Sequence, residues 1–281
     1  MANRHELLNT YRPWGLAWDV GIDLPKSGTA SARTFFGTWA KTNSLMAFVF
    51  DTTARFARLT ETITSALDKV DANRPKPPSG RRLDIWKRLG AHTQLLWEML
   101  LCRHVDNFTS YLSSILFEAF VARPQMLNSR DATIDVSVVL SQPTIRDLIN
   151  VIAERKVNAL SYKSFSDLCE YFAKQGLPIG ADNDRLRISQ AVEIRNISVH
   201  NGCVVNERFL AAVPETPRDE LGQVRLLNIH DVEPLAIVLG DLVRGLDESA
   251  IPHFGLSTST WEIDPWKHES MGTDDHSRPG S

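Results

Sequence analysis

Apolar residues recur at spacings of three and four over most of this chain, which is the period of an amphipathic helix. Residues 36–70 and 83–121 carry the two longest stretches of this pattern. Prolines between residues 74 and 80 separate them, because proline lacks the amide hydrogen that a helix needs. We therefore expect two long helices, the second either continuous or broken near Arg103. In the first helix the pattern comprises Leu45, Phe48, Val49, Phe56 and Leu59.

Four shorter helices are expected in the second half of the chain. They span about residues 143–159, 164–176, 182–201 and 231–243. Ser164, followed three residues later by Asp167, resembles a capping box. Asp182 or Asn183 is the expected N-cap of the third helix, and Asp231 that of the last.

Two connecting segments are less regular. Residues 134–140 alternate between apolar and polar side chains, which fits a short strand or a packed connector. Residues 209–229 contain two prolines and Gly222 between short apolar runs, as in a small hairpin. The pattern as a whole predicts an all-α fold: a bundle of about five to seven helices with a small irregular or hairpin insertion before the last helix.

The domain organisation follows from where the periodic pattern begins and ends. Residues 1–35 contain turn-forming glycines and prolines, so we expect an irregular N-terminal segment. Residues 36–256 are expected to form a single helical domain. Residues 257–281 are polar and are expected to be a disordered tail, unless Trp261 and Trp266 dock on the domain.

Composition places the chain among globular proteins, with 281 residues of which 43% are hydrophobic and 23% charged. No apolar run approaches the roughly 18 residues that span a bilayer, and the N-terminus lacks the apolar segment of a secretory signal. We therefore expect a cytoplasmic protein with no membrane contact. The net charge is −3, and residues 257–281 alone hold five acids and two bases. The rest of the chain is neutral, so nucleic acid would have to be bound at a local site rather than by a general basic surface.

Common catalytic templates are missing from the sequence. The three cysteines are odd in number and far apart, and they form no Cys-x-x-Cys pair. The Cys102-x-His104 pair lacks a second pair of metal ligands. The sequence also contains no P-loop, no Gly-x-Ser-x-Gly elbow and no His-Glu-x-x-His motif. These observations predict neither a metal nor a cofactor.

One segment does point to a specific chemistry. Within residues 193–202, Arg195 is followed directly by Asn196 and, five positions after the arginine, by His200, before an Asn-Gly end. This Arg-Asn-x-x-x-His segment resembles the signature of the HEPN superfamily of helical-bundle proteins, in its bacterial branch. The strong likeness covers about residues 185–210. The spacing alone is not specific, but the asparagine, the helical pattern and the Asn-Gly end together distinguish this segment.

The resemblance implies metal-independent cleavage of RNA, which would be the chain's main partner. RNA carries its own nucleophile, the 2′-hydroxyl. In this reading His200 acts as base or acid, because the pKa of histidine is near 6.5. Arg195 binds the phosphate and stabilises its developing charge, and Asn196 positions the imidazole or the phosphate. The resemblance also implies a role in bacterial stress or antiphage defence, with an antitoxin or defence-system protein as a further partner.

Helix geometry adds a constraint on this site. Five positions place Arg195 and His200 roughly 140° apart around a helix, so one helix does not aim both at one atom. The reaction also needs both a base and an acid, whereas each motif has one histidine. Both difficulties ease when two copies of the helix meet across a symmetric dimer, as the resemblance implies. We therefore expect a homodimer with a composite site.

Less specific interpretations of the same residues remain open. Cations are favourable near the C-terminus of any helix, and Asn-Gly is a common helix end, so the segment also fits a plain helix terminus. Arg195 lies within an apolar stripe, where it would pair with an internal carboxylate. The near-neutral charge favours a non-catalytic HEPN-like module that senses RNA or a nucleotide, or docks a protein. An unrelated helical scaffold is the third alternative.

Overall fold

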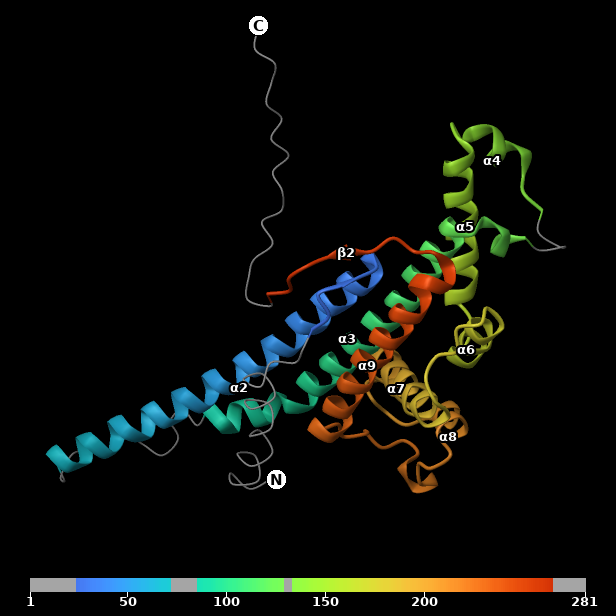
Figure 1. The fold of residues 1–281 in the computed structure, drawn as a ribbon. Helices are drawn as coiled ribbons and strands as arrows, with labels where there is room; N and C mark the ends of the chain where they lie inside the picture. The colour runs from blue at the N-terminus through green and yellow to red at the C-terminus, as the bar shows by residue number, and fades with distance from the viewer. Residues whose placement is uncertain (1–23, 72–84, 129–132, 265–281) are drawn as a thin grey trace, which may run out of the picture.

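Three long helices, α2 (Ala30–Val70), α3 (Ile85–Ala122) and α9 (Ile229–Phe254), form the centre of the fold (Figure 1). The computed structural model describes residues 24–71, 85–128 and 133–264, apart from the side chains of 85–88. Helix α3 lies in the middle and packs against both α2 and α9. The all-α fold predicted from the periodicity is confirmed.

Aromatic contacts set the register of α2 against α3. Phe35 meets Tyr111 with ring centroids 5.9 Å apart, and Phe50 stacks on Trp97 at 5.8 Å. These two pairs show that the helices run antiparallel. Helix α9 is tied to α2 by Trp39, whose Nε1 donates to the Ala236 carbonyl at 2.9 Å. The core of the protein is therefore the shared interface of the three long helices.

The shorter elements pack around one end of α3. Helices α5 (Ile145–Ser161) and α7 (Asp182–Asn201) contact α3 directly, whereas α8 (Glu207–Ala212) rests on α7. The short elements are η1 (Pro124–Leu127), α4 (Val136–Ser141), α5 (Ile145–Ser161), α6 (Phe165–Lys174), α7 (Asp182–Asn201), α8 (Glu207–Ala212) and η2 (Arg218–Glu220).

Several predicted boundaries differ from the structure. The described residues contain eight α-helices rather than five to seven, because the six-residue helices α4 and α8 were not expected. Residues 134–140 fall largely in α4 and form no strand, since Asp135 caps a helix there. Helix α3 is continuous through Arg103. The insertion before α9 is irregular, which is one of the two alternatives predicted: within it, Val224 forms an isolated antiparallel bridge with Val204.

Helix starts show how local capping competes with the apolar pattern. The capping box of Ser164 and Asp167 is confirmed at the start of α6. Helix α9 begins earlier than predicted, because its N-cap is Asn228. Asp231 is the third residue of the helix and completes a capping box with Asn228. The N-cap of α7 is Ala181, which makes no side-chain cap, so neither Asp182 nor Asn183 has the predicted role.

The two ends of the described chain are more ordered than expected. Helix α2 begins six residues before the predicted boundary at residue 36, because Thr29 caps it. Before the cap, β1 (Ser27–Gly28) pairs antiparallel with β2 (Ser259–Thr260). Trp261, directly after β2, is 8% exposed. The start of the predicted disordered tail therefore packs on the domain; residues 1–23, 74–80 and 265–281, with Trp266, lie outside the described residues.

Two carboxylates hold the N-terminus of α2 in place. Asp247 of α9 accepts hydrogen bonds from the Thr29 amide at 3.1 Å and from the Thr29 hydroxyl. Glu118 of α3 accepts from the Ser31 amide at 2.9 Å. Amides at a helix N-terminus have no partner within the helix and carry partial positive charge, so both acids stabilise this end. None of the helices in the described part of the chain has a stretch apolar and long enough to cross a bilayer.

Candidate functional site

The Arg-Asn-x-x-x-His segment lies in the second half of α7. Buried residues at spacings of three and four hold this helix on the domain, and they are Ile188, Ala191, Ile194 and Ile197. The helix ends as the sequence predicted. Gly202 adopts a left-handed conformation with φ of 58°, which glycine tolerates readily. The amides of Gly202 and Cys203 both bond to the Ile197 carbonyl.

Arg195 pairs with a carboxylate on the neighbouring helix. Its Nε donates to Oδ1 of Asp106, on α3, at 3.0 Å. The two side chains are 30% and 46% exposed, so the pair lies at the edge of the α3–α7 contact. Arg195 also donates from Nη1 to Oδ1 of Asn196 at 3.4 Å. The structure therefore brings Arg195 and Asn196 together and adds Asp106 to them.

The geometry of this pair has two consequences for an anion. The carboxylate offsets the positive charge of the guanidinium, which lowers the local positive potential. It also fixes the orientation of the guanidinium through Nε and leaves most of the N–H groups on the two Nη atoms for other acceptors. A held, partly exposed guanidinium of this kind is suited to one phosphate contact.

His200 forms no hydrogen bond with the other two motif residues. It is exposed in the last turn of α7, where its side chain forms no hydrogen bond or ion pair with any residue in the described ranges. Its imidazole is thus open to solvent and to a second molecule. Within one chain, Arg195 and Asn196 are in contact, whereas His200 bonds to neither of them.

The loop that precedes α9 is attached to α3 by Gln94. Gln94 accepts from the Leu227 amide at 2.8 Å and donates to the Arg225 carbonyl at 3.0 Å. The segment that follows Gly202 is also unusual, since Cys203 has a φ of 62° and is fully buried. A non-glycine residue in this conformation carries backbone strain. The Arg225 amide donates to the Cys203 carbonyl at 2.9 Å, so the loop before α9 links the end of the motif to α3.

Cys102 lies beside the Arg195–Asp106 pair, and Cys203 lies beside Cys102. Burial raises the pKa of Cys102 to about 11, with a further contribution from Asp106 that Arg195 opposes. Burial also raises the pKa of Cys203, whose Sγ is 3.2 Å from the Ser198 hydroxyl. Both thiols are protonated at neutral pH, so both are poor nucleophiles.

Asp106 was missed by the sequence interpretation as a specific partner. An internal carboxylate for Arg195 was expected as one alternative, but the residue was not identified. The signal in the sequence is that Asp106 is the only charged residue between His104 and Glu118, on a helix that is otherwise apolar or neutral there. A lone charge on such a helix commonly has a partner from another element.

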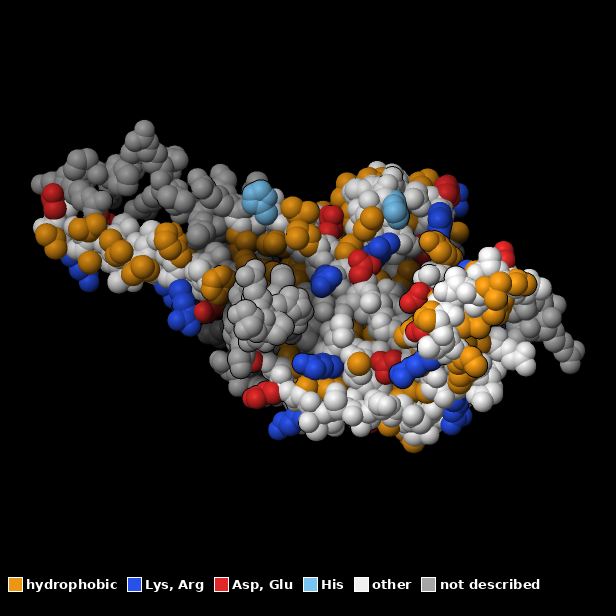
Figure 2. All heavy atoms as spheres, turned by 90° about the horizontal axis from the view of Figure 1, so that it is seen from above, with side chains coloured by type: hydrophobic (Ala, Val, Ile, Leu, Met, Phe, Trp, Pro, Cys, Tyr) orange, Lys and Arg blue, Asp and Glu red, His pale blue; other side chains and the backbone are white. Residues whose placement is uncertain are grey.

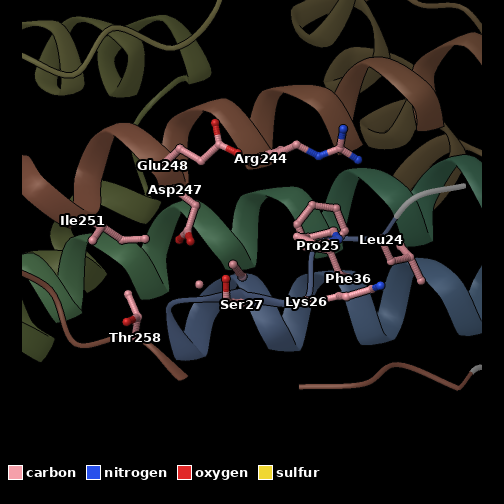
Figure 3. Close-up of a pocket in the computed structure, with 12 residues that line it drawn as sticks. Leu24, Pro25, Lys26, Ser27, Phe36, Arg244, Asp247, Glu248, Ile251 and Thr258 are labelled. Carbon is pink, nitrogen blue, oxygen red and sulfur yellow. The ribbon is translucent and has the colours of Figure 1, made fainter. Parts of the chain in front are cut away.

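A cavity of about 500 Å³ lies elsewhere, between β1, the start of α2 and α9 (Figure 3). The carboxylate of Asp247 points into this space, with Ser27 and Lys26 across from it. Asp247 is already bonded to Thr29 and accepts from the Tyr111 hydroxyl at 3.4 Å. Burial raises the pKa of Asp247, and the bonds from Thr29 oppose that rise. The carboxylate thus acts as an anchor for α2, and no residue of the motif lines the cavity.

The described residues contain no group of three or more His, Cys, Asp or Glu side chains arranged to hold a metal ion. Cys102 and His104 are two positions apart on α3, so their side chains do not face each other. Cys102 is half-buried, whereas His104 lies in the core and is 1% exposed. Comparison of the chain with family models, curated proteins and solved structures finds no match to any of them.

Proposed function

We propose that the chain is a metal-independent endoribonuclease of the HEPN type, with a site shared between two copies. The observation that carries the proposal is the arrangement on α7: a held, partly exposed Arg195 beside Asn196, and an open His200 on the last turn. These are the side chains that the resemblance assigns to RNA cleavage. The fold is compatible with the proposal, since HEPN proteins are helical bundles.

The chemistry uses only groups present in the chain and in RNA. A base removes the proton of the 2′-hydroxyl, and the oxygen attacks the adjacent phosphorus. The bond to the 5′-oxygen breaks, and an acid protonates that oxygen. The products are a 2′,3′-cyclic phosphate and a 5′-hydroxyl end. His200 supplies the base or the acid, and Arg195 stabilises charge that develops on the phosphoryl oxygens.

Two copies of the chain complete this site in the proposal. A single chain presents one His200, separated from Arg195 by the turn of the helix, whereas the reaction uses both a base and an acid. A second α7 would supply the other histidine. A site built this way is active only in the dimer, which suits an enzyme of bacterial stress or antiphage defence that an antitoxin or defence-system protein holds in check.

The proposal is tested by RNA cleavage in EDTA with the wild type, His200→Ala and Arg195→Ala. We expect cleavage by the wild type and a loss of at least about 100-fold in each variant, which is typical for removal of an acid–base or charge-stabilising group. His92→Ala is the matched control, because His92 is also an exposed histidine, on α3. Equal cleavage by wild type and His200→Ala would reject the proposal.

One observation favours a second function, a non-catalytic HEPN-like module that binds RNA or a nucleotide, or docks a protein. The Asp106 carboxylate offsets the charge of Arg195, which weakens the contact to a phosphate in the ground state. This alternative expects RNA or nucleotide binding without cleavage. It also expects that Asp106→Asn strengthens binding, because the guanidinium is then no longer neutralised.

A further inference from the structure

Helix α2 extends far beyond the body of the protein (Figure 1). Its last buried residue is Thr53, and no side chain from Ala54 to Val70 is buried. We call residues 54–70 the arm. An isolated helix of this length is marginally stable in water, and three threonines in the arm (Thr60, Thr62 and Thr64) lower its propensity further. Packing against another segment or molecule would therefore stabilise the arm.

One face of α2 carries a stripe of exposed apolar side chains that runs from the body along the arm (Figure 2). In the arm these are Phe56, Leu59, Ile63 and Leu67, which are 42–57% exposed, and Val70, which is 86% exposed. The full stripe occupies positions 45, 48, 52, 56, 59, 63, 67 and 70, and all but Thr52 are apolar. The pattern of steps repeats every 11 residues, which is about three turns of an α-helix. The stripe therefore runs almost parallel to the axis of a straight helix.

The spacing of the stripe is the same in both directions. Successive steps are three, four, four, three, four, four and three residues. When an identical helix lies antiparallel to the first, each stripe residue therefore faces a stripe residue of the second copy. The facing pairs are Leu45 with Val70, Phe48 with Leu67, Thr52 with Ile63 and Phe56 with Leu59. A stripe that matches its own reverse is a property expected of an interface with a two-fold axis.

The surface at the root of the arm continues this stripe. Leu95 and Met99 of α3 are 55% and 60% exposed. They lie on either side of Trp97, which stacks on Phe50, so they are level with the start of the stripe on α2. In the antiparallel arrangement the tip of a second arm, with Leu67 and Val70, reaches this level. The second copy would thus cover apolar surface on both helices.

The area available is sufficient for a stable dimer. A helix of 26 residues is about 39 Å long, and a contact strip about 15 Å wide would bury roughly 600 Å² on each copy, or about 1,200 Å² in total. That value is at the lower limit of stable interfaces before Leu95 and Met99 are added. The charged neighbours Asp51 and Arg55 already form an ion pair at 2.6 Å within α2, so they do not oppose the contact.

We propose that two copies of the chain dimerise through antiparallel pairing of the α2 stripes. The arms then stabilise one another. Helix α7 and its motif stay outside this interface, so the α7 contact of the proposed nuclease site would be a second, separate interface. This inference does not depend on the ribonuclease proposal, because none of Arg195, Asn196 and His200 takes part in it.

The mass of the full chain in solution, measured by light scattering or sedimentation, tests the dimer. We expect the wild type to be a dimer, or a tetramer where α7 pairs as well. The dissociation constant of the α2 contact should rise at least 10-fold in Leu59→Glu and in Ile63→Glu. Because both side chains are exposed, neither variant should disturb folding. Ser65→Glu, on the opposite side of the arm, is the matched control and should associate as the wild type does.

Cysteine cross-linking tests the direction of the two helices. In the antiparallel arrangement, a mixture of Thr52→Cys and Ile63→Cys chains forms a disulfide-linked pair, whereas neither variant alone does. Cross-links within each single variant would show parallel helices and overturn the proposal. A monomeric wild type would also overturn it, and a lower melting temperature of Leu59→Glu in that monomer would assign the stripe to a segment of the same chain.

Discussion

Arg195 on α7 and Asp106 on α3 form an ion pair with Nε and Oδ1 3.0 Å apart. The pair links the candidate catalytic arginine to the central helix of the fold, 89 positions away in the chain. It has two opposing effects in the proposed site. It holds the guanidinium ready for a phosphate, and it reduces the charge that the phosphate would meet.

The first prediction concerns the role of this pair. Because both groups are partly exposed, removing either should lower the free energy of unfolding by only about 0.2–1 kcal/mol. If Asp106 positions Arg195, Asp106→Ala should lower kcat of RNA cleavage more than it raises KM, and Asp106→Glu should restore part of kcat. An unchanged kcat in Asp106→Ala would leave the ion pair with a structural role only.

The second prediction concerns the anchor of α2. Asp247→Ala removes the acceptor for the Thr29 amide and hydroxyl in a buried site, so unfolding should require about 2–4 kcal/mol less. Urea denaturation followed by circular dichroism measures this difference. Glu248→Ala, at an exposed neighbouring position, should change stability by no more than about 0.5 kcal/mol.

The same carboxylate gives a pH dependence. Burial raises the folded-state pKa of Asp247 above its ordinary value of 3.8. The folded state therefore binds the proton more tightly than the unfolded state, and the stability from this group is lost as pH rises from 3.8 through the raised pKa. Asp247→Asn should remove that loss. An identical pH slope in wild type and Asp247→Asn would contradict the assignment.

The buried His104 should give stability the opposite dependence on pH under acidic conditions. Burial, with a smaller effect of Arg103, lowers the pKa of His104 from 6.5 to about 4. Between these values the unfolded chain binds a proton that the folded chain does not, so stability falls as pH decreases, by up to about 3 kcal/mol. His104→Met should flatten the curve of unfolding free energy over this range, whereas the exposed His92→Ala should not. If the unfolding free energy of His104→Met fell with decreasing pH as steeply as that of the wild type, another group would be responsible for the pH dependence.

A pair of glycine substitutions tests the contact between the ends of the domain. A Cβ on Gly28 would lie 2.6 Å from Asp247 Oδ2 and 2.8 Å from Trp261 Cη2. Gly28→Ala should therefore cost at least about 2 kcal/mol and expose Trp261, which fluorescence would detect. Gly37→Ala is the control: no atom lies within 4 Å of its Cβ position, inside α2, so it should stabilise by about 0.5–1 kcal/mol. Equal effects of both substitutions would show that Gly28 is not tightly packed.

The sequence predicted which segments are helical better than it predicted which faces are buried. The spacing of Leu45 and Phe48 correctly indicated a long helix, but these side chains are 60% and 54% exposed. The core of α2 is formed by Trp39 and Phe50, on another face of the helix. A helix with two apolar faces gives the correct period, and only the tertiary structure decides which face packs inside.

Features of the site that depend on neighbouring residues in the sequence were predicted correctly. Contacts with residues far away in the sequence were not predicted. The helix around Arg195 and its end at Gly202 follow from neighbouring residues, which is why both are confirmed. Asp106 and Asp247 act on residues far away in the chain, and no sequence spacing connects them to their partners. The assignment of Arg195, Asn196 and His200 to RNA cleavage stays a prediction.

The most direct test of that prediction is the His200→Ala cleavage assay in EDTA, with the ends of the products identified. The ribonuclease account predicts that the wild type cleaves RNA to 2′,3′-cyclic phosphate and 5′-hydroxyl ends, and that His200→Ala does not, while its circular dichroism spectrum and mass in solution are unchanged. Cleavage that persists in His200→Ala, or that EDTA abolishes, would contradict the account.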